Sequence, residues 1–175
     1  GTYSLQGSTL ITGGGLRNYN FALNVDKAYL ESDFYRGPLN AQFTLKEGTI
    51  FNRVMPELAG NLTIQDSTIS FPAIPDSDNS ILPDMLLDVG INVGKNVHFY
   101  KSMLYNMDIS GNIHYGGTTK HPKPSGEINV LKGTVEYLQT VFKIREGTAY
   151  FNQVDSFLPS ITFKADTTLS QTKVY

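Results

Sequence analysis

Apolar and polar residues alternate along most of this chain, and this pattern restricts the fold more than any other feature of the sequence. Successive side chains of a strand point to opposite faces, so a period of two predicts strands that each carry one apolar face. Clear examples are residues 19–25, 39–45, 87–93 and 103–109. No long window shows a helical period, so the chain is predicted to be nearly all β.

One strand-forming unit is repeated. The segment "GNLTIQDSTISF" at residues 60–71 matches "GEINVLKGTVEY" at residues 126–137, and weaker copies lie at 43–50 and 142–151. Each copy has a strand, two mostly polar residues, a Gly or Ser, a Thr and a second strand. A glycine at that point can supply the positive φ of a tight hairpin or bulge. We therefore expect strand, sharp turn and strand, stacked along one sheet.

Two segments lack the alternation. Residues 72–84 and 116–125 are dense in Pro, Gly, Ser and Asp, which favour turns over central strands. Both are predicted to be exposed loops. The strand pattern resumes after each of them, so residues 1–175 are expected to form a single domain.

The composition excludes several classes of function. A net charge of -2 gives no electrostatic basis for binding nucleic acid. The absence of cysteine excludes disulfides and thiolate chemistry. No apolar run is long enough for a membrane-spanning helix. Both ends break off without a cap or polar tail, and we expect the chain to be a piece excised from a longer protein.

No catalytic or metal-binding motif is apparent. His98, His114 and His121 have no second ligand at a metal-binding spacing, and the glycines at 13–15 do not fit a phosphate-binding loop. The carboxylates fall singly at turns or on the polar side of strands. We therefore expect no enzyme activity, no cofactor and no metal.

A small basic cluster lies in the second predicted loop. Lys120, His121 and Lys123 could contact anionic lipid head groups. The alternative is a solubilising loop tip, which is the more common role of exposed lysines.

The alternation fits two architectures. In a closed sandwich or barrel, every inward side chain meets another across roughly 10 Å. In an open trough, the apolar face stays unfilled and can hold a long, flexible apolar ligand. The pattern alone does not separate them.

The C-terminal half resembles the C-terminal domain of the TamB family, in the AsmA-like group. The resemblance covers about residues 85–170, on the strand from Leu87 to Val93, then "SGEINVLKGTVEY", "FKIREGTAYF" and "LPSITFKADTT". It implies a curved, mostly antiparallel sheet with a U-shaped cross-section, called a β-taco, around an apolar groove.

The resemblance also implies a setting. The longer protein would be anchored in the inner membrane, cross the periplasm and meet an outer-membrane barrel of the TamA type. Two roles follow from the family: transfer of phospholipid between the membranes, or help in assembling outer-membrane β-barrels. A simple scaffold or adhesin-like sandwich is the third possibility that the residues leave open.

Alternation and the resemblance together predict which side chains meet lipid. In the strand around residue 128, Ile128 and Val130 should face the groove while Glu127 and Asn129 face away. The predicted groove residues, expected to contact phospholipid acyl chains, are Leu23, Val25, Phe43, Leu45, Leu62, Ile64, Val89, Ile91, Val93, Met107, Ile109, Ile113, Ile128, Val130, Phe142, Ile144, Ile161 and Phe163.

Overall fold

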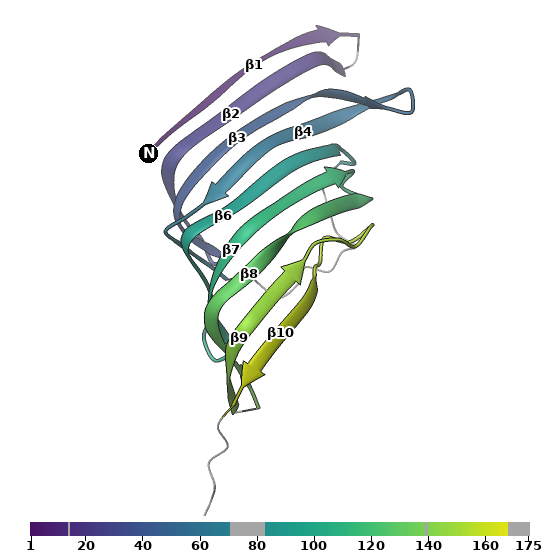
Figure 1. The fold of residues 1–175 in the computed structure, drawn as a ribbon. Coiled ribbons are helices and arrows are strands. Elements are labelled where there is room, and N and C mark those ends of the chain that lie inside the picture. The colour runs from purple at the N-terminus through teal and green to yellow at the C-terminus, as the bar shows by residue number, and fades with distance from the viewer. Residues whose placement is uncertain (14, 71–82, 139, 168–175) are drawn as a thin grey trace, which may run out of the picture.

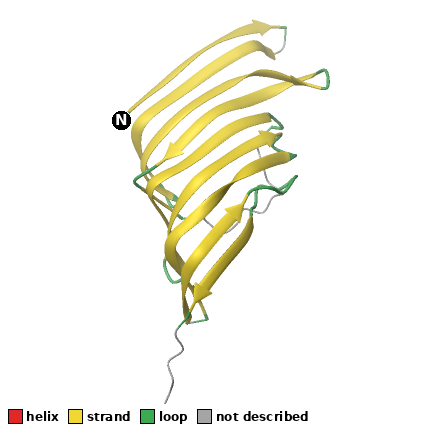
Figure 2. Ribbon diagram, viewed as in Figure 1, coloured by secondary structure: helices red, strands yellow, loops and turns green. Residues whose placement is uncertain are grey.

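The chain folds into one ten-stranded sheet. The computed structural model describes residues 1–13, 15–70, 83–138 and 140–167, and this part of the chain contains strands and loops but no helix (Figures 1 and 2). The strands are β1 (Thr2–Thr12), β2 (Gly15–Glu31), β3 (Tyr35–Ile50), β4 (Arg53–Ile64), β5 (Ser67–Ile69), β6 (Leu86–Lys101), β7 (Tyr105–Gly117), β8 (Pro122–Tyr137), β9 (Thr140–Tyr150) and β10 (Ser160–Asp166).

Neighbouring strands are mostly antiparallel. Their order is β1-β2-β3-β4-β6-β7-β8-β9-β10, and β5 continues the line of β4 between β3 and β6. β4 and β5 both run parallel to β6, whereas every other pair is antiparallel. The prediction of a mostly antiparallel, curved all-β sheet is confirmed.

The sheet turns back on itself along a line that we call the crease. Figure 1 shows the long strands curving together on the left of the view. The pairing register shifts there, between Val25 and Ala28 on β2 and between Val93 and Val97 on β6. Bulges of this kind bend a strand and increase its twist. These shifts fall along one line across the sheet, on β2 and on β6 with β3 and β4 between them, and together they bend the sheet.

The sequence repeat marks the crease. Between β4 and β5 the repeat centres on Gln65 and Asp66, and its second copy centres on Leu131 and Lys132, where the register of β8 against β9 also shifts. The repeated unit is therefore one bent strand and not a hairpin.

The Gly or Ser that recurs in the repeat was expected to supply a positive φ, but its role is to allow close approach of the neighbouring strand. Neither Gly133 nor Gly147 has a positive φ; Asp66 does, at 50°. A Cβ at Gly133 would lie 2.5 Å from Met107 Cγ and 2.6 Å from Asn106 O on the neighbouring strand. Glycine is required there by the close approach of β7.

Burial shows which face lies inside the curve. Val97, beside the crease, is only 1% exposed. In a single sheet without a covering layer among the described residues, such burial requires the sheet to fold over its own side chains. The same cluster joins Tyr35 and Ile64, which lie on opposite sides of the crease. The apolar face is therefore the concave one.

The crease divides the sheet into two halves, one on each side of it, which we call the near leg and the far leg and define by the turns at their outer edges. The near leg ends in the turns at 51–52 and 118–121 and in the connection at 151–159, and we call this edge the near rim. The far leg ends in the turns at 32–34 and 102–104 and at Leu138, after β8, and this edge is the far rim.

The predicted loop at 116–125 is shorter than expected. β7 extends to Gly117 and β8 begins at Pro122, so only residues 118–121 form the turn. Pro122 and Pro124 are buried in β8. Strand β9 ends at Tyr150, opposite Glu127, so the stretch of β8 before Glu127 has no β9 residue beside it. It is a local sheet edge, and a proline there removes no hydrogen bond between β8 and β9. Most of the other predicted loop, 72–84, lies outside the described residues.

Candidate functional site

Paired residues of neighbouring strands place the apolar side chains in rows across the concave face. Residues directly opposite each other in a sheet share a face. One row joins Leu5, Leu23, Phe43, Gly60, Val89 and Tyr115, the next joins Tyr3, Val25, Ala41, Leu62, Ile91 and Ile113, and a third joins Leu39, Ile64, Val93, Gly111, Ile128 and Ala149.

The rows continue beyond the crease. Val97, Ile109, Val130, Gly147 and Phe163 form one, and Tyr35, Ile69, Phe99, Met107, Gly133 and Ile144 form another. Every residue predicted for the groove falls on this face. The predicted groove residues did not include Tyr3, Leu5, Tyr35, Leu39, Val97 and Tyr115. Leu39 lies in the alternating segment at residues 39–45, and the same period-two pattern places most of the others on this face.

The concave face is filled at the crease and open toward both edges. Ile64, Val93, Ile128 and Ile144 are buried against other side chains of the sheet, so they contribute to the core. Toward the N-terminal edge the exposure rises, to 36% at Leu23 and 71% at Leu5 on β1. On the other side, Ile161 and Phe163 of β10 are 67% and 62% exposed, so an apolar ligand finds free surface at both edges of the face.

Aromatic side chains pack together at β7, near the start of β8. The ring of Tyr115 lies 5.5 Å from that of Phe157 and 6.2 Å from that of Phe151. Tyr115 Oη donates a hydrogen bond to Phe157 O across 3.3 Å. Burial raises the pKa of the Tyr115 phenol. The connection 151–159 thus packs onto the concave face at β7 and β8.

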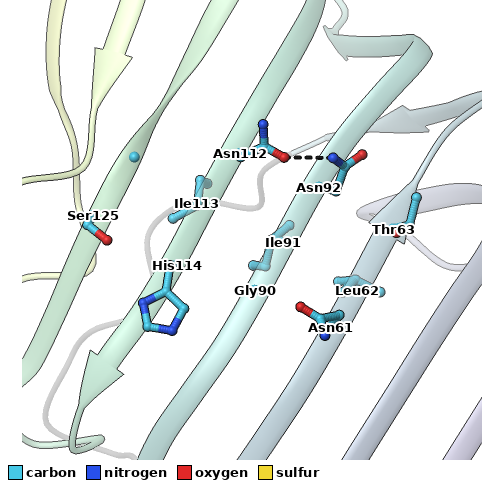
Figure 3. Close-up of a pocket in the computed structure, with 11 residues that line it drawn as sticks. Asn61, Leu62, Thr63, Gly90, Ile91, Asn92, Asn112, Ile113, His114 and Ser125 are labelled. Atoms are coloured by element: carbon cyan, nitrogen blue, oxygen red, sulfur yellow. Dashed lines mark hydrogen bonds between the residues drawn. The ribbon is translucent and has the colours of Figure 1, made fainter.

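Two hollows of the surface are lined partly by polar residues. The larger, of about 520 Å³, is on the convex face above Gly90 and is lined by Asn61, Thr63, Asn92, Asn112, His114 and Ser125 (Figure 3). Asn92 Nδ2 donates to Asn112 Oδ1 across 2.6 Å. Leu62, Ile91 and Ile113 also line this hollow, at positions between the polar ones. Because the same three residues belong to the concave rows, we assign the apolar site to those rows.

Each histidine pairs with an aspartate on a neighbouring element. His98 Nδ1 lies 2.5 Å from Asp108 Oδ1, His114 Nε2 lies 2.8 Å from Asp88 Oδ1, and His121 Nδ1 lies 3.1 Å from Asp155 Oδ1. Spacing along the chain gave no sign of these pairs, because sheet register brings them together. Lys132 and then His98 hold the pKa of Asp108 below its ordinary value.

The described residues contain no group of three or more His, Asp or Glu side chains that could hold a metal. The His–Asp pairs lie apart on the exposed surface, and no nucleophile is aligned with any of them among the hydrogen bonds of this part of the chain.

The basic cluster occupies the near rim. Lys120 and His121 lie in the turn at 118–121 and Lys123 lies at the start of β8, and all three are exposed. Two carboxylates lie beside this turn. Asp155 pairs with His121, and Asp84 Oδ1 lies 3.4 Å from Lys120 N. The cluster is therefore weakly basic at most.

The two edges of the sheet differ. β1 presents 11 residues, "TYSLQGSTLIT", without a charge or a proline. β10 has 7 residues, and its Lys164 and Asp166 pair with Glu146 and Arg145. Charges on an edge strand oppose pairing with another chain, so β1 is the edge that remains open to a further strand.

Comparison with known proteins gives one family. The family model described as the TamB C-terminal domain matches residues 1–175. The match includes the first 80 residues. These residues carry none of the motifs on which the resemblance of the C-terminal half was recognised. Among curated proteins, no sequence matches the chain. The described residues form no helix that is long and apolar enough to cross a membrane.

Proposed function

We infer the function from a premise that the family match supplies: the chain belongs to the TamB C-terminal domain family. Membership supports a role in assembly or transport at the cell envelope, in a family of transport and assembly modules that is not a known enzyme family. The family works with outer-membrane components and implies an envelope-associated protein.

Within this role, we propose that the chain carries phospholipid acyl chains along its concave face. The setting that we propose is the periplasm, where the chain would form part of a longer protein anchored in the inner membrane. A barrel of the TamA type would be its outer-membrane partner.

The observation that carries this proposal is the continuity of the apolar rows. Together, though not singly, they cover the sheet from β1 to β10, and the rows that bracket the crease hold no charged side chain. Nine strand positions at ~4.8 Å give a face of roughly 40 Å along the stacking direction. The hydrocarbon of one leaflet is about 15 Å thick, so a tail fits on this face with room to move.

The energetics suit movement as well as binding. Each buried methylene contributes ~0.8 kcal/mol. This attraction has no preferred direction, so a wall of repeated aliphatic side chains offers many similar positions and no single deep one. Exposed apolar side chains at both edges of the concave face, Leu5 near one end and Ile161 and Phe163 on β10, give a tail two open ends at which to enter or leave.

The edge of β1 favours a second candidate. An uncharged 11-residue edge can accept a strand of another polypeptide by backbone hydrogen bonding. This would suit a module that handles strands of outer-membrane barrels during assembly.

Site-specific photo-cross-linking tests the two candidates. A cross-linker at Phe43 faces the concave rows, whereas its neighbour Thr44 faces away. Lipid transfer predicts phospholipid adducts at position 43 and not at position 44 when the chain is isolated from envelopes. Adducts to barrel polypeptides at β1 positions, with none to lipid at position 43, would support strand handling and contradict lipid transfer.

A further inference from the structure

The turns of the far rim end in large apolar side chains. Phe34 lies in the β2–β3 turn, Met103 and Leu104 in the β6–β7 turn, and Leu138 in the β8–β9 turn. All four are exposed, with Met103 at 81% and Leu138 at 80%. Turn positions are normally taken by Gly, Asn, Asp, Pro or Ser, each for a backbone reason. Ser32, Asp33 and Ser102 follow that rule in these turns, whereas the four apolar residues depart from it.

Two of these residues are also unfavourable for the backbone. Met103 has a φ of 62° and Leu138 a φ of 48°, both in the left-handed region. Gly or Asn takes this conformation at a lower cost than Met or Leu. Neither the exposed side chain nor its backbone stabilises the sheet, so the choice of residue points to a contact outside the chain.

The exposed apolar turn residues Phe34, Met103, Leu104 and Leu138, which we call the tips, lie along one edge of the sheet. β6, β7, β8 and β9 are consecutive in the sheet, so the turns that carry Met103 and Leu138 lie about two strand spacings apart, or ~10 Å. Glu136 N donates to Leu104 O across 2.8 Å, which ties the β6–β7 turn to the end of β8, two residues before Leu138. Exposed Tyr137 adds a phenol next to Leu138. The near rim is mixed: its turn at 118–121 is polar, whereas Phe51 in the turn at 51–52 and Val154, Phe157 and Leu158 in the connection at 151–159 are exposed.

From this arrangement we propose that the far rim inserts its apolar tips into the surface of a phospholipid bilayer. A protein partner would have to offer a separate pocket to each tip, because the exposed, charged Glu136 of β8 lies between the β6–β7 turn and Leu138. Fluid acyl chains accommodate separate tips without matching pockets. Tyrosine beside such tips suits the boundary between head groups and hydrocarbon.

The inference goes beyond the proposed function and does not depend on it. Tips on the rim could hold the sheet at a membrane whether or not the concave face carries lipid. A test on vesicles therefore leaves the photo-cross-linking result for the concave face as a separate question.

The experiment is flotation with vesicles of phosphatidylethanolamine and phosphatidylglycerol. The variant Met103→Asn with Leu138→Asn keeps a residue suited to the left-handed backbone at both turns, so its thermal unfolding should match that of the wild type or exceed it. Its binding to vesicles should be weaker by at least roughly tenfold, since two apolar side chains no longer leave water.

Phe51 provides the matched control. It also has a positive φ, 45°, and is 93% exposed, but it lies on the near rim. Phe51→Asn should float as well as the wild type. The inference fails if the wild type does not float, if the double variant floats equally well, or if Phe51→Asn loses as much binding.

A second measurement covers the case in which the double variant does not fold. Since the chain has no cysteine, Met103→Cys and Lys120→Cys each give one site for an environment-sensitive fluorophore. Vesicles should shift the emission to the blue at position 103 and leave it unchanged at position 120. An equal response at the two rims would overturn the inference.

Discussion

Asn96 Nδ2 donates a hydrogen bond to Asp66 Oδ1 across 2.7 Å, and both residues have a positive φ at the crease. Asp66 N also donates to Lys95 O across 2.9 Å. The bulges of two adjacent strands are thus joined by side chain and backbone at the point where the sheet bends.

Substitution of Asn96 should therefore weaken the crease. Asn96→Val places a β-branched residue at a φ of 55° and removes the hydrogen bond, which should lower the free energy of unfolding by about 2–3 kcal/mol. Asn96→Gly removes only the side-chain bond and should cost about 1 kcal/mol. Urea unfolding of both variants checks this. Equal effects of Val and Gly would show that the backbone conformation does not matter.

An arginine introduced on the concave face should affect stability and lipid binding differently at different positions. Leu23 is partly exposed near one open end, so an arginine there can reach water, and Leu23→Arg should stay folded while losing lipid. Its neighbour Asn24 faces the other side, and Asn24→Arg should change neither property. Thermal unfolding and lipid extraction of both variants are the measurements. Retention of lipid by folded Leu23→Arg would argue against transport over this end.

Close to the crease the same change should destabilise the fold. Val130 packs opposite Gly147, where an added Cβ would lie only 3.1 Å from Val130. An arginine at this half-buried position must displace its neighbours, and Val130→Arg should lower the free energy of unfolding by about 3–5 kcal/mol. Denaturant unfolding decides it. A loss below about 1 kcal/mol would show that the crease is less tightly packed than described.

Asp108 should make stability depend on acid pH. Lys132 and His98 lower its pKa in the folded state, so its carboxylate stabilises the fold above the ordinary pKa of an aspartate, about 4. This contribution is lost as the pH falls through the lower, folded-state value. Asp108→Asn should lower stability near neutral pH and flatten the acid slope. Urea unfolding between about pH 6 and 3 tests this, and an unchanged slope would assign the acid sensitivity to other groups.

The uncharged edge of β1 should promote association between copies of the chain. A lysine on an edge strand opposes pairing. Gln6→Lys should therefore reduce concentration-dependent association, whereas Asn24→Lys, on the same face of the fully paired β2, should not. Sedimentation equilibrium distinguishes them. A wild-type chain that stays monomeric at high concentration would show that the edge is already protected.

Alternation by itself determined the fold class and the division of side chains between two faces, because the period of a strand is a local property. Residues such as Ile91 and Ile113 could be assigned to the apolar face from parity alone. The family could also be recognised locally, on motifs between Leu87 and the end of β10.

Only the tertiary structure decided the shape and the chemistry of the surface. The two-residue interruption at Leu131 and Lys132 reads equally well as a hairpin or a bulge, and the bend follows only when bulges of neighbouring strands come into line. The pairing of His98 with Asp108, the parallel alignment of β4 with β6 and the collection of Met103 and Leu138 on one rim depend on sheet register. Register is set by long-range contacts, which a local pattern does not specify.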